Sequence, residues 1–298
     1  MRFGIVILPE YRWSEAAPRW RAAEQLGFDK AWTYDHLSWH ALQDSPWYGT
    51  VPTLTAAALV TTRIRLGTFV TSPNFRHPLT VTRDLLALDD ISGGRFDCGI
   101  GSGGGIDSRI LGGPEMSPRQ LVDRLTEFVV LLDRLLTTDR VDHSGEYFST
   151  RNGRTVPGCV QRPRVPFVIA ASGPRSQALA AEYGAGWVTT GRRGPGSPAQ
   201  EMDEWFAKSA SLNRRMDEIL QERGREPGEV DRHLLLDTSP RYSLTSVAAF
   251  EEMTGRAAEA GFTDVIAHWP RADGVYAGTV DVLESVAAEV MPRWRTVS

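Results

Sequence analysis

An acid and an imidazole stand side by side near the start of the chain. Ala31–Tyr34 has the aromatic and β-favouring residues of a buried strand, and Asp35 and His36 follow it directly. The segment before it ends at Gly27 and has the composition of a helix end. A carboxylate and an imidazole at the mouth of a strand are suited to proton transfer, because imidazole titrates near neutral pH. A histidine that only hydrogen-bonds Asp35 is the alternative.

A metal site is the next chemistry to consider. His36 and His40 are four residues apart, but no glutamate separates them as in an H-E-x-x-H zinc site, so we expect no metal there. Cys98 and Cys159 are too few for a disulfide framework or a cysteine-rich metal site. A metal-dependent barrel hydrolase remains an alternative, with ligands drawn from His36, His77, His268 and Asp237.

Composition excludes several kinds of partner. The chain has 298 residues, 41% of them hydrophobic, so it can bury a large core in one or two domains. Its net charge of −4 offers no basic surface to nucleic acid. The apolar run Ile5–Leu8 ends at Pro9, too short to cross a membrane, and the N-terminus lacks a signal-peptide pattern. We expect a cytoplasmic globular protein with a small-molecule substrate.

Three junctions along the chain share one form: an alanine-rich helix end, a glycine suited to a left-handed turn, then an apolar strand. Their glycines are Gly27, Gly184 and Gly261. Such repeats indicate βαβ units and a parallel sheet. The predicted strands are Phe3–Leu8, Lys30–Tyr34, Arg65–Val70, Arg95–Ile100, Pro166–Ala171, Trp187–Thr190, Leu234–Asp237 and Asp264–His268. This alternation predicts an α/β protein, a single (β/α)8 TIM barrel over residues 1–298 with insertions in its βα loops. An open doubly wound sheet is the alternative.

Helix signals and long connections complete the plan. Apolar residues recur at three- and four-residue steps from Leu121 to Leu136, after a capping box that begins at Ser117. Ser197–Gln200 has the same capping form. We expect residues 138–166 to be an insertion that covers the barrel mouth. We expect Gly191–Pro198 to be a mobile basic loop, of the kind that acts as a lid.

Active sites of such barrels lie at the C-terminal ends of the strands. Gly101–Gly105 lies at one such end and departs from a dinucleotide fingerprint, because no helix is predicted before Arg119. We interpret it as a backbone surface that a flat ring can approach. Ala171–Ser176 enters a helix and exposes N–H groups suited to a phosphate, with Arg192 and Arg193 supplying charge. An ordinary tight turn is the alternative there. Three further aromatic residues, Trp39, Trp47 and Tyr48, form either a wall for a planar ligand or simple loop packing.

Several of these stretches together resemble the bacterial luciferase-like oxidoreductases. They are Gly27–Leu37, Leu66–Pro78, Leu88–Phe96, Gly99–Gly103, Ala171–Pro174 and Trp187–Gly191. The resemblance covers nearly the whole chain and implies the same barrel. It also implies binding of the deazaflavin coenzyme F-420 or of FMN at the barrel mouth. Asp-His after the second strand is the form associated with the deazaflavin branch.

The resemblance implies roles for individual residues. His36, with Asp35 and Trp39, belongs to the catalytic group, and Asp35 also holds the cofactor. A non-proline cis peptide bond is implied at Phe69–Val70. Further cofactor contacts fall on Phe69, Val70, Thr71, Ser72, Gly101, Ser102, Ala171, Ser172, Gly173, Pro174, Thr190, Gly191 and Arg192. Sugar-phosphate dehydrogenases of the branch carry an acid where this chain has Gly103–Gly105, which disfavours glucose-6-phosphate oxidation.

These features predict an oxidoreductase that transfers a hydride between F-420 and a small organic substrate, as a reductase of C=C or C=N bonds. An FMN-dependent monooxygenase is the alternative, supplied with reduced flavin by a partner reductase. A non-catalytic cofactor-binding protein is a third hypothesis. The family often forms dimers, so a homodimer is expected.

Overall fold

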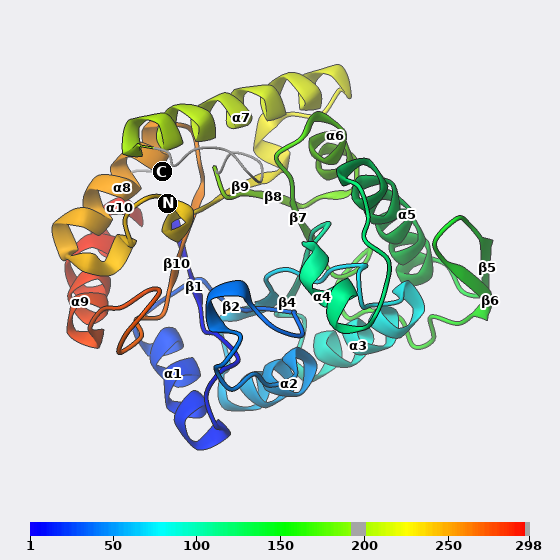
Figure 1. The fold of residues 1–298 in the computed structure, drawn as a ribbon, viewed down its shortest axis with the longest axis horizontal. Coiled ribbons are helices and arrows are strands. Elements are labelled where there is room, and N and C mark those ends of the chain that lie inside the picture. Colours follow the sequence, from blue (N-terminus) through cyan, green and yellow to red (C-terminus); the bar gives the residue numbers. More distant parts are fainter. Residues whose placement is uncertain (192–200, 296–298) are drawn as a thin grey trace.

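The computed structural model describes residues 1–191 and 201–295. Its parallel strands close into a barrel in the order β1-β10-β9-β8-β7-β4-β3-β2 (Figure 1). They are β1 (Arg2–Val6), β2 (Lys30–Thr33), β3 (Arg65–Thr68), β4 (Phe96–Ile100), β7 (Phe167–Ala170), β8 (Gly186–Thr189), β9 (Asp231–Leu235) and β10 (Asp264–His268). The predicted barrel is confirmed. The open-sheet alternative is wrong, because β1 pairs in register with β10.

Side chains of each strand alternate between two cores. On β1 and just beyond it, Phe3, Ile5 and Ile7 pack outward against the helices, whereas Val6 and Leu8 fill the barrel interior. Strands buried on both faces explain the continuous apolar runs in the sequence. The interior core also contains aromatic residues from the strand ends. These residues form the floor of the barrel mouth.

Helices surround the barrel (Figure 1). They are α1 (Trp13–Gln25), α2 (Thr50–Val60), α3 (Pro78–Ile91), α4 (Gly105–Ile110), α5 (Pro118–Thr137), α6 (Pro174–Tyr183), α7 (Met202–Glu222), α8 (Val247–Glu259), α9 (Val280–Ser285) and α10 (Met291–Arg295). α5 begins with the predicted capping box, in which Ser117 and Gln120 exchange hydrogen bonds. The second predicted capping box and the predicted lid loop lie in or extend into residues 192–200, outside the described residues. Among the described helices, none combines the length and apolar character needed to cross a membrane.

The left-handed glycine was a correct prediction at two of the three junctions. Gly27 and Gly261 have φ of 84° and 83°. Gly184 is different, with φ −81° and ψ 136°. Its N–H bonds to the carbonyl oxygen of Ala180 at 2.9 Å, and a Cβ there would lie 2.5 Å from that same oxygen. Glycine at position 184 therefore allows a close backbone approach rather than a left-handed turn.

The seventh predicted strand is displaced along the chain. Leu234–Asp237 was predicted, but β9 covers Asp231–Leu235, and Leu236–Thr238 forms a 3-10 helix. The polar residues that open β9 do not look like a buried strand, yet Arg232 and His233 are buried by the neighbouring elements. Tertiary packing overrides local propensity there.

The insertion does not cover the barrel mouth. Within residues 138–166, β5 (Val141–Ser144) and β6 (Ser149–Gly153) form a hairpin, which Figure 1 shows on the periphery beyond α5. Glu127 on α5 accepts backbone N–H bonds from Tyr147 and Phe148, at 3.0 and 2.9 Å. These bonds fix the hairpin to the outer face of the helix, so the prediction that it covers the mouth is wrong.

Candidate active site at the barrel mouth

His36 follows β2 and is held by a carboxylate that sequence reasoning missed. Its Nδ1 lies 2.8 Å from Oδ2 of Asp107, whose Oδ1 accepts the N–H of Leu37 at 2.7 Å. Asp107 has no exposed surface. A carboxylate only accepts hydrogen bonds, so Nδ1 carries the proton and Nε2 presents its lone pair. Within residues 1–191 and 201–295, no group is hydrogen-bonded to that Nε2.

Asp35 faces away from its neighbour. Its Oδ1 accepts from Nη2 of Arg76 at 2.6 Å, and its Oδ2 accepts from Oγ1 of Thr71 at 2.8 Å. The alternative in which His36 only bonds Asp35 is therefore wrong, because the imidazole partner is Asp107. With 2% of its surface exposed, Asp35 joins the chain after β2 to the chain after β3. Its contact with a cofactor stays a prediction.

Aromatic rings gather around Tyr34, between β2 and His36. The ring centre of Tyr34 lies 4.9 Å from that of Trp39, 5.9 Å from His36 and 6.5 Å from Phe69. Trp47 donates its indole N–H to the backbone oxygen of His36 at 2.8 Å. Trp39 and Trp47 thus belong to one aromatic group at the mouth, and this group also positions His36.

The ends of β3 and β4 meet without side-chain bulk. The Phe69–Val70 peptide bond is cis, as the resemblance implied. A Cβ on Gly101 would lie only 2.6 Å from Cγ2 of Val70, so glycine is needed for the two strand ends to approach. Asn74 donates to the backbone oxygen of Ser102 at 3.0 Å and joins the two loops. Ser72, from the predicted set, is fully buried beneath them.

The predicted phosphate region lies at the start of α6. Gly173 is the N-cap of the helix. The Oγ atom of Ser172 lies 3.3 Å from Oγ1 of Thr189 on β8. A cavity of about 540 Å³ is lined by Gly173–Ser176 together with Pro118, Arg119 and Val122. Arg215 of α7 donates to the backbone oxygen of Ser172 at 2.7 Å, a basic contact that the sequence did not predict.

The remaining predicted contacts lie on adjacent strand ends. Ala171 is buried after β7, and its oxygen accepts the indole N–H of Trp187 at 2.8 Å. The oxygen of Thr190 accepts from Trp205 at 2.8 Å. Gly191 has φ 63°. Arg192 and Arg193 lie outside the described residues.

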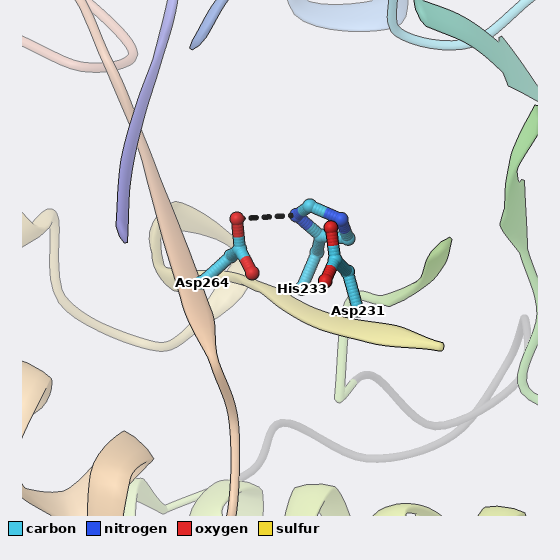
Figure 2. Close-up of side chains that lie close together, drawn as sticks. All are labelled: Asp231, His233 and Asp264. Atoms are coloured by element: carbon cyan, nitrogen blue, oxygen red, sulfur yellow. Dashed lines mark ion pairs between the residues drawn. The ribbon is translucent and has the colours of Figure 1, made fainter. Parts of the chain in front are cut away.

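A separate charged cluster closes the opposite end of the barrel. Figure 2 shows Asp231, His233 and Asp264, whose candidate ligand atoms lie within 4.8 Å of one another. Arg2 Nη2 contacts both carboxylates, at 2.5 and 2.6 Å, and Lys30 Nζ lies 3.7 Å from Asp231. Burial lowers the pKa of His233 to about 4, so its ring is neutral at pH 7. The protein's own cations already neutralise these carboxylates, and we assign the cluster as a structural ion-pair network.

The hydrolase alternative requires residues that the structure separates. His36 bonds Asp107, whereas His77 Nε2 lies 3.2 Å from the backbone oxygen of Ser149 on the hairpin. His268 and Asp237 form a pair of their own, with Nδ1 and Oδ2 3.0 Å apart.

Asp107 was missed because its helix was missed. The sequence predicts no helix between the glycine run and Arg119, but α4 forms at Gly105–Ile110 and brings Asp107 to His36. An acid in the first turn after a glycine run is a weak helix-start signal that could have located it. The local sequence pattern does not indicate which distant side chain that acid contacts.

Comparison with known proteins adds independent findings. The family model described as "Luciferase-like monooxygenase" matches residues 1–237. An F-420-dependent hydroxymycolic acid dehydrogenase of Mycobacterium tuberculosis is 34% identical over 194 residues, which is 63% of this chain and 52% of the relative. An F-420-dependent glucose-6-phosphate dehydrogenase of Beutenbergia cavernae is 35% identical over 181 residues, 58% of this chain and 51% of the relative. The chain thus spans about half the length of each.

A solved structure matches the fold over the whole chain. The F-420-dependent secondary alcohol dehydrogenase in complex with an F-420–acetone adduct superposes with a TM-score of 0.80. The match covers 98% of both chains at 17% sequence identity, a level that speaks for the fold alone.

Proposed function

The chain belongs to the luciferase-like monooxygenase family, and from this premise we propose that it is an oxidoreductase that moves a hydride between coenzyme F-420 and a small organic substrate. The names of its F-420-dependent relatives support the choice of cofactor. The observation that carries the proposal is the buried Asp107–His36 pair after β2, which leaves Nε2 of His36 without a hydrogen-bond partner among the described residues.

The residues at the mouth fit a planar ring with an anionic tail. Gly101 leaves room beside the Val70 side chain at the floor of the mouth, and Trp39 adds an aromatic side. The α6 N-terminus offers backbone N–H groups to a phosphate, in a cavity that Arg119 and Arg175 also line. Arg175 also pairs with Asp123, which keeps the guanidinium at this edge.

Each residue at the mouth has a role that follows from its contacts. Bound deazaflavin supplies or accepts the hydride. Nε2 of His36 holds or takes a proton at the ring edge, and Asp107 fixes the tautomer and stabilises the imidazolium form. Phe69 and Trp39 exclude water from the place where charge develops.

Two kinds of substrate are compatible with the proposed hydride transfer. Reduction of a C=C or C=N bond is one use of such a site, and exchange between an alcohol and a carbonyl is another. A homodimer, and a partner that supplies reduced cofactor, remain predictions. The acid missing at Gly103–Gly105 is not replaced by Asp107, whose oxygens are bonded to His36 and Leu37. We therefore still disfavour a sugar phosphate.

The test is a pair of binding titrations of the purified protein, one with oxidised F-420 and one with FMN. We expect F-420 to bind more tightly. Tighter binding of FMN, with oxygen consumed in the presence of reduced flavin, would make the protein a flavin monooxygenase instead. Binding of neither cofactor would refute the proposal.

A variant then separates turnover from cofactor binding. His36→Ala is expected to retain F-420 binding within a few-fold and to lose about 10²–10⁴-fold in turnover. Trp294→Phe is a matched control, since Trp294 lies near the closed end of the barrel, where its backbone oxygen accepts from the Met1 amine. Turnover that is unaffected by His36→Ala would leave a cofactor-binding protein whose chemistry lies elsewhere.

A further inference from the structure

A second acid–histidine pair contacts Tyr34, the residue whose ring also contacts His36. Nδ1 of His268, at the end of β10, lies 3.0 Å from Oδ2 of Asp237. Nε2 of His268 lies 2.8 Å from the hydroxyl of Tyr34. All three residues are buried: His268 is 0% exposed, Asp237 6% and Tyr34 3%. Because they come from three different strand ends, only the closed barrel assembles them.

The hydrogen bonds fix where the protons lie. Asp237 accepts the backbone N–H of His268 at Oδ2, 2.5 Å away, and that of Ser243 at Oδ1, 2.9 Å away. A carboxylate has two acceptor oxygens and no N–H group to donate. It can only accept from His268, so Nδ1 carries a proton, and the Nε2 lone pair accepts the hydroxyl of Tyr34. Tyr276 stacks on the imidazole at 3.7 Å and fixes its plane.

The same ring of Tyr34 touches the proposed catalytic histidine. Its centre lies 5.9 Å from His36 and 5.6 Å from His268, edge-on to both. Tyr34 is thus the one residue in contact with both histidines among the described ring contacts. The arrangement resembles a catalytic triad: the acid (Asp237) orients the histidine (His268), and the histidine activates the hydroxyl (Tyr34).

We propose that Asp237, His268 and Tyr34 form a proton relay, and that this relay serves an alcohol or the corresponding carbonyl compound as substrate. The proposal rests on the proposed function, because it needs a hydride acceptor in the same mouth. His36 then acts at the cofactor ring, and Tyr34 handles the proton of the substrate.

The proposed step is balanced in atoms and electrons. The alcohol O–H bond breaks and its proton goes to the oxygen of Tyr34, while the proton of Tyr34 passes to Nε2 of His268. The carbinol C–H bond breaks and its hydrogen leaves with both electrons as a hydride to oxidised F-420. The C=O double bond forms. His268 is left as an imidazolium facing the carboxylate of Asp237, and the reverse sequence reduces a carbonyl.

The surroundings of Tyr34 select the kind of alcohol. Trp39 and Phe69 flank its ring, so the substrate meets aromatic carbon rather than cationic side chains at this point. A phenol exchanges protons readily with another oxygen, whereas reduction of a C=C bond requires proton delivery to carbon. A secondary alcohol with apolar substituents fits this position better than a sugar phosphate or an alkene.

The relay itself is tested by NMR of the protein labelled with ¹⁵N in its histidines, without cofactor. We expect His268 to be protonated at Nδ1 and hydrogen-bonded as an acceptor at Nε2. Tyr34→Phe removes one oxygen atom and should move the Nε2 resonance of His268 toward that of an unbonded nitrogen. Tyr242→Phe is the matched control, because the Tyr242 hydroxyl donates to the backbone oxygen of His268 and not to its ring. An Nε2 resonance that does not respond to Tyr34→Phe would refute the relay.

Turnover tests the chemistry, with propan-2-ol and cyclohexanol as probes for oxidation and 2-cyclohexenone and a cyclic imine as probes for reduction. We expect alcohol oxidation with F-420, and a loss of at least about 100-fold in kcat in Tyr34→Phe with KM and F-420 affinity little changed. Tyr242→Phe should stay close to wild type. Turnover of the C=C or C=N probes without the alcohols overturns the relay, as do equal kcat values in the two phenylalanine variants. Failure to bind F-420 overturns the proposed function itself, a result that the titrations report separately.

Discussion

Replacement of Asp107 by asparagine tests the charge that holds His36. Both side chains have the same shape, but the amide offers one acceptor and one donor group. If its oxygen faces His36, its NH₂ faces the N–H of Leu37, and two donors meet where a 2.7 Å bond existed. If its NH₂ faces His36, the imidazole must carry its proton on Nε2 and loses the lone pair at the mouth.

The magnitude follows from the burial of the pair. Asp107 is fully buried, so an unsatisfied group at this position costs about 1–3 kcal/mol of folding stability. The wrong tautomer costs more in catalysis, since the same change in a serine-protease triad lowers turnover about 10⁴-fold. His36 acts here on charge rather than on a nucleophile. We therefore expect a loss of about 10²–10³-fold in kcat for Asp107→Asn, within the range of general acid–base effects.

The assay combines F-420 turnover with the ¹⁵N spectrum of His36 and a urea unfolding curve. Asp89→Asn is the control, because Asp89 is equally buried on α3 and bonds Gln161 outside the mouth, at 2.8 and 3.0 Å. It should lose comparable stability and keep its turnover. The reasoning is refuted if Asp107→Asn keeps kcat within twofold, or if both variants lose activity in proportion to their loss of stability.

Three further predictions concern stability and the floor of the site. Burial lowers the pKa of His233 from 6.5 to about 4, so about 3 kcal/mol of stability is present above pH 6.5 and is lost as the pH falls toward 4. Urea midpoints measured between pH 7 and pH 4 should show this loss, and in His233→Gln the midpoint should depend less on pH over the same range. Gly101→Ala forces a Cβ against Val70, so it should cost about 1–3 kcal/mol in urea unfolding and weaken F-420 binding at least about tenfold, a loss of about 1.4 kcal/mol; an unaltered Kd contradicts this floor. Arg76→Met leaves Asp35 buried without its cation and should cost about 3 kcal/mol in urea unfolding, against no change if that ion pair is dispensable.

The barrel could be predicted from the sequence because the pattern of helix end, glycine and apolar strand is repeated along the chain. Helix ends with a following glycine and apolar strand occur at intervals, and an error at one strand does not disturb the rest. β9 is a strand that local sequence patterns do not predict correctly. Its polar opening residues are buried only because β8 and β10 lie beside them, and no property of Arg232 or His233 alone predicts a strand.

The site was predictable in position but not in pairing. Strand-end logic placed His36 and His268 at the mouth, and the structure has both there. The acid that each one bonds lies 71 and 31 residues away along the chain. Adjacency in sequence suggested Asp35 as the partner of His36, but that carboxylate is taken by Arg76. Partner choice between loops is decided by how the strands close, which local patterns do not contain.

The pairing of β1 with β10 also sets an order in time. During synthesis, β1 leaves the ribosome first and must wait for almost the entire chain before Gly4 and Ile266 can meet. Until then its edge is unpaired and open to association with other chains. His268 stands on that last strand, so the second histidine of the mouth arrives only when the barrel closes. A nascent or truncated chain that lacks β10 therefore has an open sheet edge and an incomplete site at once.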